Sequence, residues 1–419
     1  MREEKSETIE RKYDRKGILR KEKITRRSTK EITIPSRIEQ RNLKKEQGKW
    51  LKRKKWPATS ENGKVINGVD LFSGCGGITM GLWDACRENG LKLEMIMACD
   101  LFPAAQKSFE DNFKPKIFLN EPIENYVNGE IGSKLTKEEK SLKKMLGDIN
   151  VVVGGPPCQG NSNLNNHTRY TDPRNELYMR MIRFVEVIKP EIILIENVRG
   201  VVRAKQNVVG RASDYLTDKL GYSVDNGVIK GVDIGIPQTR IRHFTIAVRK
   251  KGIDFSFDHI NSKMVSEPRP VSWAIGDLFG NTNEKLFDST PSVTKINQDR
   301  MNYLIDNDVY NLPNKERPPC QQKDDHTYPA VYGRMWWDKP APTLTTGFGC
   351  NGRGRFTHPK EPRVLTPHEA ARVQTFPDFF DFSMIEKRTD LHDLIGNAVP
   401  PLMAKHVIDY LLKMNSMTE

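Results

Sequence analysis

The sequence predicts an α/β protein with a doubly wound, mostly parallel sheet and a second, smaller domain of irregular structure. Between residues 64 and 250, short apolar runs rich in β-branched residues alternate with helix-like segments of about 10 to 14 residues. This alternation is typical of a parallel sheet that helices cover on both faces. A glycine-rich turn follows the first apolar run, where such sheets bind ligands. After about Lys250 the alternation is lost, which indicates that a different kind of domain begins there.

The individual elements follow from the same pattern. The strands that we expect are 65–72, 93–99, 117–119, 150–154, 192–195, 228–233 and 243–249. The helices that we expect are 78–89, 103–112, 136–146, 175–188, 366–375 and 402–412. Thr366 as N-cap, Pro367 at the first helical position and Glu369 at the third predict a capping box for the helix at 366–375.

The positive charge of the chain is concentrated at its N-terminal end. The net charge is +13, and residues 1–55 alone hold 21 Lys and Arg against 9 Asp and Glu. Such an arm suits a polyanion whose phosphates it would neutralise. The alternative is a solvated tail that has no partner of its own. Apolar residues from Ile38 to Leu51 indicate a short helix near the end of the arm.

Cysteine usage and hydropathy limit the classes of protein that remain. The six cysteines are scattered, without the paired spacing of a zinc site. No apolar stretch is long enough for a membrane span, and the charged start lacks the apolar region of a signal peptide. We therefore expect a cytoplasmic, reduced protein with no structural metal and no membrane association.

The segment from Asn150 to Ser162 reads NVVVGGPPCQGNS and is the centre of the functional prediction. A buried strand passes here into a loop that two prolines stiffen, and Cys158 follows them directly. A cysteine at a strand end faces the crevice where open α/β sheets bind ligands, so we interpret Cys158 as a nucleophile. The alternative is a small buried apolar side chain, which is the usual role of a free cysteine.

A second candidate site is the turn that reads DLFSGCGG, from Asp70 to Gly77. Its glycines let the backbone approach a ligand closely, and the start of the next helix favours an anionic group. Asp100, at the end of the second expected strand, stands where an acidic side chain commonly binds a ribose. A nicotinamide oxidoreductase is disfavoured, because the fingerprint GxGxxG is absent.

Four motifs in order give the chain a family resemblance: GGPPCQ from Gly154, ENV at 196–198, QTRIR at 238–242 and GNAVPP at 396–401. With them the chain resembles the DNA cytosine-5 methyltransferase family over about residues 68–407. The resemblance implies a Rossmann-like methyltransferase fold with S-adenosylmethionine (SAM) as donor and S-adenosylhomocysteine as product. It also implies that a set of residues binds the donor: Phe72, Gly74, Gly76, Gly77, Asp100, Leu101, Glu121 and Asn397.

The chemistry of the family explains why these residue types are needed. C5 of cytosine is a poor nucleophile, and addition of the Cys158 thiolate to C6 would activate it. Glu196 follows an apolar strand, so burial should raise the pKa of its carboxyl and let it share a proton with N3 of the base. Arg242 is expected on the O2 side of the ring. Arg240 is expected to lower the pKa of the cysteine, or equally to bind phosphate.

Because the target carbon lies inside a duplex, the base must be extruded into the site. The polar loop 159–174 is expected to close over the DNA, with contacts from Gln159, Ser162 and Arg169. Recognition of the DNA sequence is expected from residues 271–362, where Arg353 or Arg355 would contact guanine. The neighbouring Trp336 and Trp337 serve either this surface or the core of the small domain.

These expectations combine into a scheme of domains and partners. The scheme has a basic arm at 1–63, part of it without fixed structure, and a catalytic domain at 64–270. A target-recognition domain with a hinge follows at 271–391, and a C-terminal helix at 392–419 returns to the catalytic domain. The expected partners are duplex DNA and a cognate restriction endonuclease, and the enzyme is expected to be a monomer. Two alternatives stay open: a tRNA cytosine-5 methyltransferase and a catalytically silent DNA-binding relative.

Overall fold

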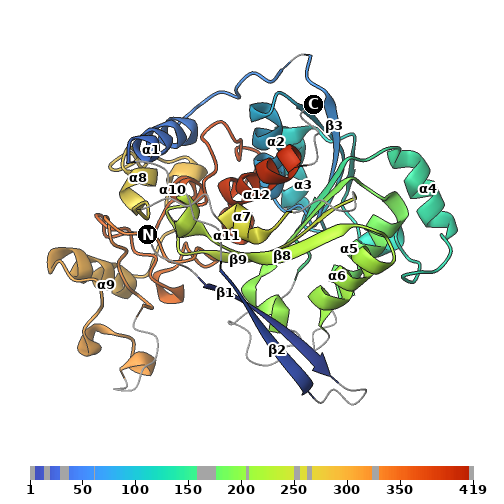
Figure 1. Cartoon of the computed structure of the whole chain (residues 1–419). Helices are drawn as coiled ribbons and strands as arrows, with labels where there is room; N and C mark the ends of the chain where they lie inside the picture. Colours follow the sequence, from blue (N-terminus) through green and yellow to red (C-terminus); the bar gives the residue numbers. More distant parts are fainter. Residues whose placement is uncertain are drawn as a thin grey trace.

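The structure is a computed structural model, and one seven-stranded sheet forms its centre (Figure 1). It describes residues 5–13, 19–28, 37–60, 62–157, 176–203, 207–249, 255–261, 267–322 and 330–414, with the first two ranges described as backbone only. The sheet order is β5-β4-β3-β6-β7-β9-β8. Its strands are β3 Val65–Leu71, β4 Lys92–Cys99, β5 Ile117–Leu119, β6 Val151–Gly154, β7 Ile192–Val198, β8 Ser223–Lys230 and β9 Ile241–Val248.

The sheet is parallel from β5 to β7, while β9 runs antiparallel to both β7 and β8. The expected fold class is therefore confirmed. All seven expected strands are present, although β7 is longer than expected and β8 begins five residues earlier than expected and ends at Lys230, so that residues 231–233 of the expected strand lie instead in a 3-10 helix, Gly231–Ile234. Polar residues extend both strands, which an apolar pattern does not detect.

Helices cover both faces of the sheet. They are α2 Gly77–Glu88, α3 Pro103–Phe113, α4 Lys137–Leu146, α5 Glu176–Ile188, α6 Val208–Asp218, α7 Phe257–Asn261 and α12 Pro401–Met414. Residues of α4, α5 and α6 share one buried cluster with the sheet, and residues of α2, α7 and α12 share the other. Val152 belongs to the first cluster, whereas Val151 and Val153 belong to the second. Both faces of the central strand are thus buried, as expected for a parallel sheet.

The remaining part of the chain packs beside the sheet around a third buried cluster. Its helices are α8 Val271–Ile275, α9 Lys295–Asp306, α10 Pro367–Val373 and α11 Arg388–Asn397. The capping box of α10 is formed, since Thr366 and Glu369 each accept a backbone N–H of the other. Helices α6, α9 and α11 were not expected from the sequence. In α6 the buried residues Val208, Ala212 and Leu216 do recur at a helical spacing, so this helix could have been predicted from the sequence, whereas α9 and α11 have few buried apolar residues.

The N-terminal arm contains the helix expected between Ile38 and Leu51, but this helix packs against the rest of the chain and is not part of a separate arm at 1–63. Its first part forms an antiparallel ribbon of β1 Lys5–Tyr13 and β2 Leu19–Ser28, and helix α1 spans Arg37–Leu51. Leu51 is buried, and its carbonyl accepts the Asp378 N–H at 3.0 Å. The ring of Trp50 lies 5.1 Å from that of Phe379, centre to centre. Helix α1 is therefore part of the packed body.

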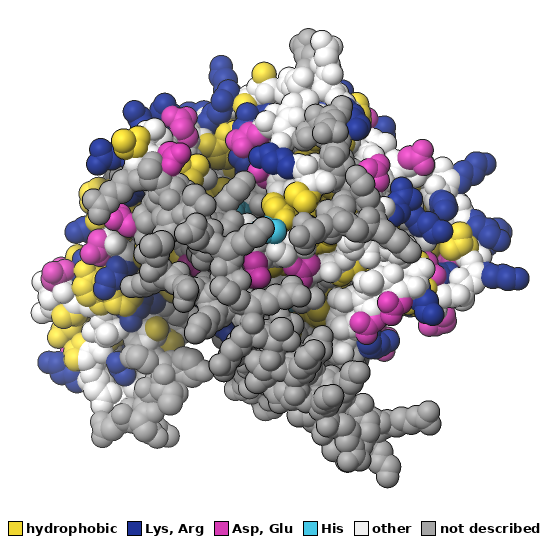
Figure 2. Space-filling view, in the orientation of Figure 1, with side chains coloured by type: hydrophobic (Ala, Val, Ile, Leu, Met, Phe, Trp, Pro, Cys, Tyr) yellow, Lys and Arg dark blue, Asp and Glu magenta, His cyan; other side chains and the backbone are white. Residues whose placement is uncertain are grey.

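Positively charged side chains lie at the surface of the described chain. Figure 2 shows Lys and Arg side chains over α1 at the upper left and over α4 at the right-hand edge. Acidic side chains are interspersed among them, as the balanced charge after residue 55 requires. No helix in the described ranges combines the length and the apolar character needed to span a bilayer.

Candidate active site

The turn between β3 and α2 is built from unusual backbone conformations. Phe72, Gly74 and Gly76 all have positive φ angles, of 59°, 52° and 89°. Phe72 is the only one of the three that has a side chain, and strain of this kind is concentrated at functional sites. The turn lies beside Asp100, whose carboxylate accepts the Gly74 N–H at 2.8 Å and the Phe102 N–H at 2.9 Å. Asp100 therefore fixes the turn while it faces the end of β3.

The glycines of this turn have different functions. A Cβ atom on Gly76 would lie 2.4 Å from the Phe113 ring, and one on Gly77 would lie 2.3 Å from the Val399 carbonyl oxygen. Both residues are glycine because neighbouring atoms leave no room. A Cβ on Gly74 would meet no atom of the described chain within 4 Å. Gly74 is thus the position at which the backbone borders open space.

Behind the turn, Asp70 is a buried carboxyl for which the sequence predicted no separate role. It accepts a hydrogen bond of 2.6 Å from the Thr79 hydroxyl on α2. Burial raises the pKa of Asp70 to about 8, against the effect of the Thr79 hydrogen bond, and the charge of Asp100 adds to the rise. This pair joins the end of β3 to the first turns of α2.

The other expected donor residues lie around the same strand ends. Leu101 is 62% exposed, which is unusual for a leucine that follows a buried strand. Glu121 is exposed, and its two carboxylate oxygens accept hydrogen bonds from Asn125 and Tyr126 at 2.9 and 2.8 Å. Asn397 is exposed at the end of α11.

The described chain continues from β6 through Gly155, Pro156 and Pro157, and Cys158 lies outside the described residues, as do Gln159, Ser162 and Arg169. The Pro156 carbonyl accepts a hydrogen bond of 3.1 Å from the side chain of Asn197. Asn197 is buried and lies next to Glu196 on β7. The sequence reading gave Asn197 no role of its own, although it stands in the ENV motif.

Glu196 and Arg242 form an ion pair at the ends of two paired strands. Arg242 Nε lies 2.7 Å from Glu196 Oε1, and Glu196 is only 7% exposed. The register of β7 and β9 explains the contact, because Val198 faces Arg242 across the ladder. Burial raises the pKa of the Glu196 carboxyl above its ordinary value, although the charges of Arg242 and Arg240 oppose the rise. The direction is the one that the sequence predicted.

Arg240 lies in a different environment from Arg242. Its guanidinium is buried and donates to the carbonyl of Leu344 at 2.8 Å and to those of Gly396 and Asn397 at 3.4 Å. These carbonyls belong to distant segments that meet at the start of β9. Arg240 thus holds the segments of the site together, and its two terminal nitrogens are engaged within the chain.

The chain is similar to known proteins over most of its length. The C-5 cytosine-specific DNA methylase family matches residues 66–413. The chain belongs to this family. It is 44% identical over 368 residues to the type II methyltransferase M1.BsuMI of Bacillus subtilis, a match that covers 88% of this chain and 84% of that protein. It is 29% identical over 350 residues to the type II methylase M.HgiDII of Herpetosiphon aurantiacus, covering 80% and 92% of the two chains.

Solved structures agree with this assignment. An E. coli protein described as a DNA modification methyltransferase encoded within a prophage has a TM-score of 0.59 and 25% identity, with 83% of this chain and 99% of that chain covered. The Dnmt2 methyltransferase of S. pombe shares the fold, with a TM-score of 0.54 at 19% identity over 83% of this chain and 98% of that chain. The chain is a DNA (cytosine-5)-methyltransferase.

On the recognition side of the methyltransferase, the two arginines expected to read DNA differ. Arg353 is exposed at the end of a short 3-10 turn, Asn351–Arg353. Arg355 is buried and donates to the Tyr310 carbonyl at 2.7 Å and to the Arg334 carbonyl at 2.9 Å. Its guanidinium also lies 4.2 Å from the centre of the Trp336 ring. Arg355 is therefore a scaffold residue in this structure, whereas the Arg353 side chain is exposed.

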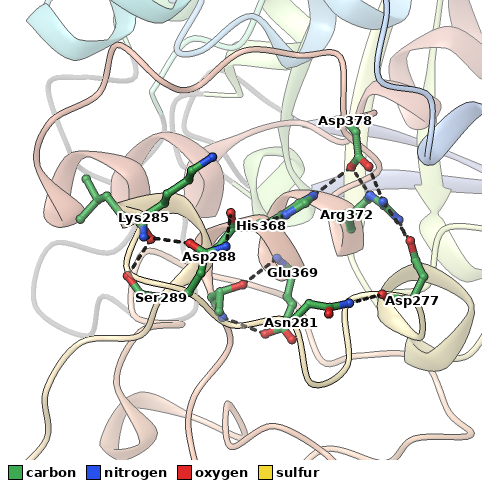
Figure 3. Close-up of polar contacts among 12 residues, drawn as sticks. Asp277, Asn281, Lys285, Asp288, Ser289, His368, Glu369, Arg372 and Asp378 are labelled. Atoms are coloured by element: carbon green, nitrogen blue, oxygen red, sulfur yellow. Dashed lines mark hydrogen bonds and ion pairs between the residues drawn. The ribbon is translucent and has the colours of Figure 1, made fainter.

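Helix α10 carries the polar network that Figure 3 shows. The two ring nitrogens of His368 contact the carboxylates of Asp288 and Asp378 at 2.8 and 2.9 Å. Arg372, on the same helix, pairs with Asp378 and lies 3.3 Å from Asp277. These contacts hold the Arg372 side chain within the fold, which indicates a structural role.

One cluster on this side has ligand types that suit a metal, namely His358, Glu361 and Glu369. Both of its carboxylates already pair with one arginine, since Arg363 donates to Glu369 at 2.7 Å and also forms a hydrogen bond with Glu361. The Nδ1 atom of His358 accepts the backbone N–H of Glu361 at 3.1 Å. A guanidinium thus occupies the position of the cation.

A large cleft of about 860 Å³ lies between α1, α2 and α12. None of the expected donor or catalytic residues is among the described residues that line it. Lys405 pairs with Asp84 at 2.7 Å, and Arg87 lies over the ring of Trp50. The cleft is separate from the turn at Gly74.

Proposed function

We propose that this methyltransferase transfers a methyl group from SAM to C5 of a cytosine that has swung out of a specific duplex sequence, through a covalent bond to Cys158. The observation that supports the proposal best is the buried Glu196, paired with Arg242 at 2.7 Å. This pair lies beside the segment Gly155–Pro157, which leads directly into Cys158. A proton donor, a cation and the backbone segment that leads into Cys158 therefore lie together at the C-terminal ends of β6 and β7.

In the first step, the thiolate of Cys158 adds to C6 of the cytosine, and the electrons of the C5–C6 double bond move toward N3 and O2. Glu196 gives a proton to N3, and the burial that raises the pKa of its carboxyl favours the protonated form that this step needs. Arg242 stabilises the charge that develops at O2. C5 becomes nucleophilic and forms the new carbon–carbon bond. A base then removes the C5 proton, the S–C6 bond breaks, the thiolate leaves, and N3 returns its proton to Glu196.

Bound SAM would supply the methyl group as an electrophile: the bond from this methyl to the sulfonium sulfur breaks as the carbon–carbon bond forms, and S-adenosylhomocysteine leaves with the bonding electrons. Two observations indicate that the donor turn fits this group: open space beside Gly74 and a carboxylate, Asp100, at the neighbouring strand end. We assign the ribose hydroxyls to Asp100 and the adenine to the exposed face of Leu101. The other members of the proposed donor set are Phe72, Gly76, Gly77, Glu121 and Asn397. Of these, Gly76 and Gly77 act by allowing close packing.

For DNA, we propose that Arg353 reads a base edge and that Gln159, Ser162 and Arg169 contact the strand from which the base is extruded. Arg355 is removed from this set because its donors are engaged within the chain. The relatives are type II methyltransferases. We therefore propose that this enzyme modifies one short sequence as a monomer, and that it protects this sequence from a cognate restriction endonuclease.

The test is bisulfite sequencing of DNA from cells that express the wild type, Cys158→Ser or the control Cys320→Ser. Cys320 is an exposed cysteine outside the proposed site, so it controls for loss of any thiol. We expect the wild type and Cys320→Ser to methylate one short sequence. Cys158→Ser should leave that sequence unmethylated while it still binds SAM and duplex DNA.

Methylation by Cys158→Ser at the wild-type level would remove Cys158 from its role. Methylation of tRNA without methylation of DNA would favour the alternative of a tRNA cytosine-5 methyltransferase. DNA binding by the wild type without any methylation would mark the chain as a catalytically silent relative.

A further inference from the structure

Two buried glutamine side chains meet where the sheet joins the recognition side. Gln238 precedes β9, and Gln374 follows α10 at the C-cap position. Both are fully buried. Gln238 Nε2 donates to Gln374 Oε1 at 2.9 Å, across a separation of 136 positions in the sequence. We call these two side chains the amide pair.

The amide pair continues into the backbone on both sides. The Leu344 N–H donates to Gln238 Oε1 at 2.9 Å. Gln374 Nε2 donates in turn to the Ile395 carbonyl at 2.6 Å. One line of hydrogen bonds therefore joins four separate segments of the chain, and the low dielectric of the interior strengthens each bond in such a line.

From Gln238, which lies inside this line of hydrogen bonds, the chain leads to the residues of the proposed chemistry. Gln238 is four residues from Arg242, and the short segment between them is fixed by Arg240, which binds the Leu344 carbonyl. Arg242 then pairs with Glu196. A shift of Gln238 would therefore change the position of Arg242 against Glu196.

From Leu344, which is one end of the line, the chain leads to the exposed Arg353. The segment after Leu344 packs so closely against Gly396 that a Cβ atom there would lie 2.4 Å from the Thr346 nitrogen. Gly347 lies under the side chain of Arg353, since a Cβ there would be 2.7 Å from its Cδ atom. Backbone packed this tightly transmits a displacement. Residues 344–353 and the end of α11 should thus move together.

We propose that Gln238 and Gln374 are positioning residues for methyl transfer, and that the amide pair couples the seating of residues 344–353 on DNA to the placement of Arg242 and Glu196. The inference rests on the proposed function, which assigns the chemistry to Arg242 and Glu196 and DNA contact to Arg353. Neither glutamine touches the reacting atoms in this account. Their effect is on geometry, and they act through Leu344 and Ile395.

The test uses Gln238→Met and Gln374→Met in the full-length enzyme, because methionine keeps the volume of the side chain. We expect kcat to fall on the order of 10²-fold, as for a misplacement of about 1 Å at a reacting centre, while KM for SAM changes little. The fraction of methylated cytosines outside the wild-type sequence should rise. The double variant should be no worse than either single variant, because the pair acts as one unit.

Asn150→Leu is the matched control. The Asn150 side chain accepts the Asn67 N–H at 2.9 Å and donates to Glu191 at 2.8 Å. These contacts lie at the N-terminal end of β6, whereas the proposed site lies beyond its C-terminal end. The Asn150→Leu variant loses two side-chain hydrogen bonds, as Gln238→Met does, whereas Gln374→Met loses a third, to the Ala398 carbonyl. The kcat of Asn150→Leu is therefore compared with that of Gln238→Met after the stability of both variants has been measured by urea unfolding. Its kcat and its sequence preference should match the wild type.

Gln238→Glu gives a readout that a purely structural role would not produce. A protonated glutamic acid can donate to Gln374 Oε1 as the amide does, and burial raises the pKa of its carboxyl. The activity of Gln238→Glu relative to the wild type should therefore increase as the pH falls. Gln238→Met should show no such recovery. This variant also keeps the proposal testable if the methionine variants do not fold.

The proposal is overturned if the glutamine variants keep wild-type kcat and sequence preference, or if Asn150→Leu loses kcat equally for the same loss of stability. A ratio of Gln238→Glu to wild-type activity that does not depend on pH would also overturn it. In each case the wild type would still methylate through Cys158. Failure of the proposed function itself would appear separately, as methylation by Cys158→Ser.

Discussion

The seven-stranded sheet and the recognition side hold their functional side chains by different means. Asp100 and Glu196 stand at the ends of strands whose backbones are paired along their length. In the described ranges 267–322 and 330–391, β structure is limited to isolated bridges. Carbonyls there are bound by buried arginines, as Arg334 binds the Pro359 carbonyl and Arg355 the Tyr310 carbonyl.

This difference shows how irregular backbone can be kept in one conformation. Buried carbonyls need donors wherever they lie, and a guanidinium can satisfy several at once. On the sheet, the loss of one side chain leaves the backbone ladder intact. On the recognition side, the loss of one arginine frees the segments that it joins. The comparison leads to four predictions, which start with the largest effect.

The first prediction compares Arg372→Met on α10 with Arg183→Met on α5. Arg183 is fully buried and forms a salt bridge of 2.7 Å with Glu139, and Arg372 is paired with Asp378. Arg183→Met leaves the buried Glu139 without its cation, so urea unfolding should show a loss of about 3–5 kcal/mol. Arg372→Met should cost less, because the half-buried Asp378 keeps its contact with His368. Only Arg372→Met should lower kcat of the folded enzyme, because α10 carries Gln374. Equal kcat for the two variants would contradict the comparison.

The second prediction concerns the donor turn and uses Gly90 as a matched position. Gly74 and Gly90 both have positive φ, and a Cβ atom on either would meet no described atom within 4 Å. Alanine should therefore cost both sites a similar amount of folding free energy, about 1 kcal/mol. Only Gly74→Ala should weaken SAM binding, by about tenfold or 1.4 kcal/mol, as measured by titration calorimetry. Unchanged SAM affinity would show that the backbone at Gly74 does not face the donor.

The third prediction is a pH dependence of stability that arises from His368. Burial alone would lower the pKa of His368, but hydrogen bonds to Asp378 and Asp288 outweigh it, and the pKa is raised above the ordinary 6.5. The nearby charge of Arg372 opposes the rise. The contribution of protonated His368 to the free energy of unfolding is thus fully present below pH 6.5, and it is lost as the pH rises through the raised pKa. His368→Gln should lack this slope in urea unfolding from pH 6 to 9, and an unchanged slope would assign it to another group.

The smallest effect is expected from the N-terminal arm. Deletion of residues 1–36 should weaken DNA binding and flatten its dependence on salt, because Lys and Arg that neutralise phosphates are removed. Deletion through residue 55 is a poorer test, since it also removes the buried Leu51. Binding isotherms at several salt concentrations would measure the slope. An unchanged slope would show that the arm does not contact DNA.

Much of the sheet could be predicted from the sequence because local patterns determine it. The β-branched runs from Val151 and from Ile192 predicted β6 and β7, and the apolar strand before Glu196 predicted its burial. The packing of α1 could not be predicted, since its contact with the rest of the chain depends on only a few residues around Trp50. The contact of Gln238 with Gln374 leaves no local signal, because the two lie far apart in the chain.

Arg353 and Arg355 illustrate the same limit at the recognition site. They are alike in type and two positions apart, so the sequence could not distinguish a DNA contact from a scaffold residue. The distinction depends on carbonyls that distant segments bring to Arg355. The role of a side chain was therefore easier to predict in a regular strand than in a loop, because hydrogen bonds to distant segments determine the conformation of the loop.

The central claim is that Cys158 bonds to C6 of the target cytosine, and one measurement tests it most directly. The wild type is incubated with SAM and duplex DNA in which 5-fluorocytosine replaces the target base, and the products are analysed by peptide mass mapping. Fluorine at C5 cannot leave as a proton does, so the adduct should persist. We predict one added nucleotide on the peptide that contains Cys158. Methyl transfer without an adduct, or an adduct on another residue, would contradict this account.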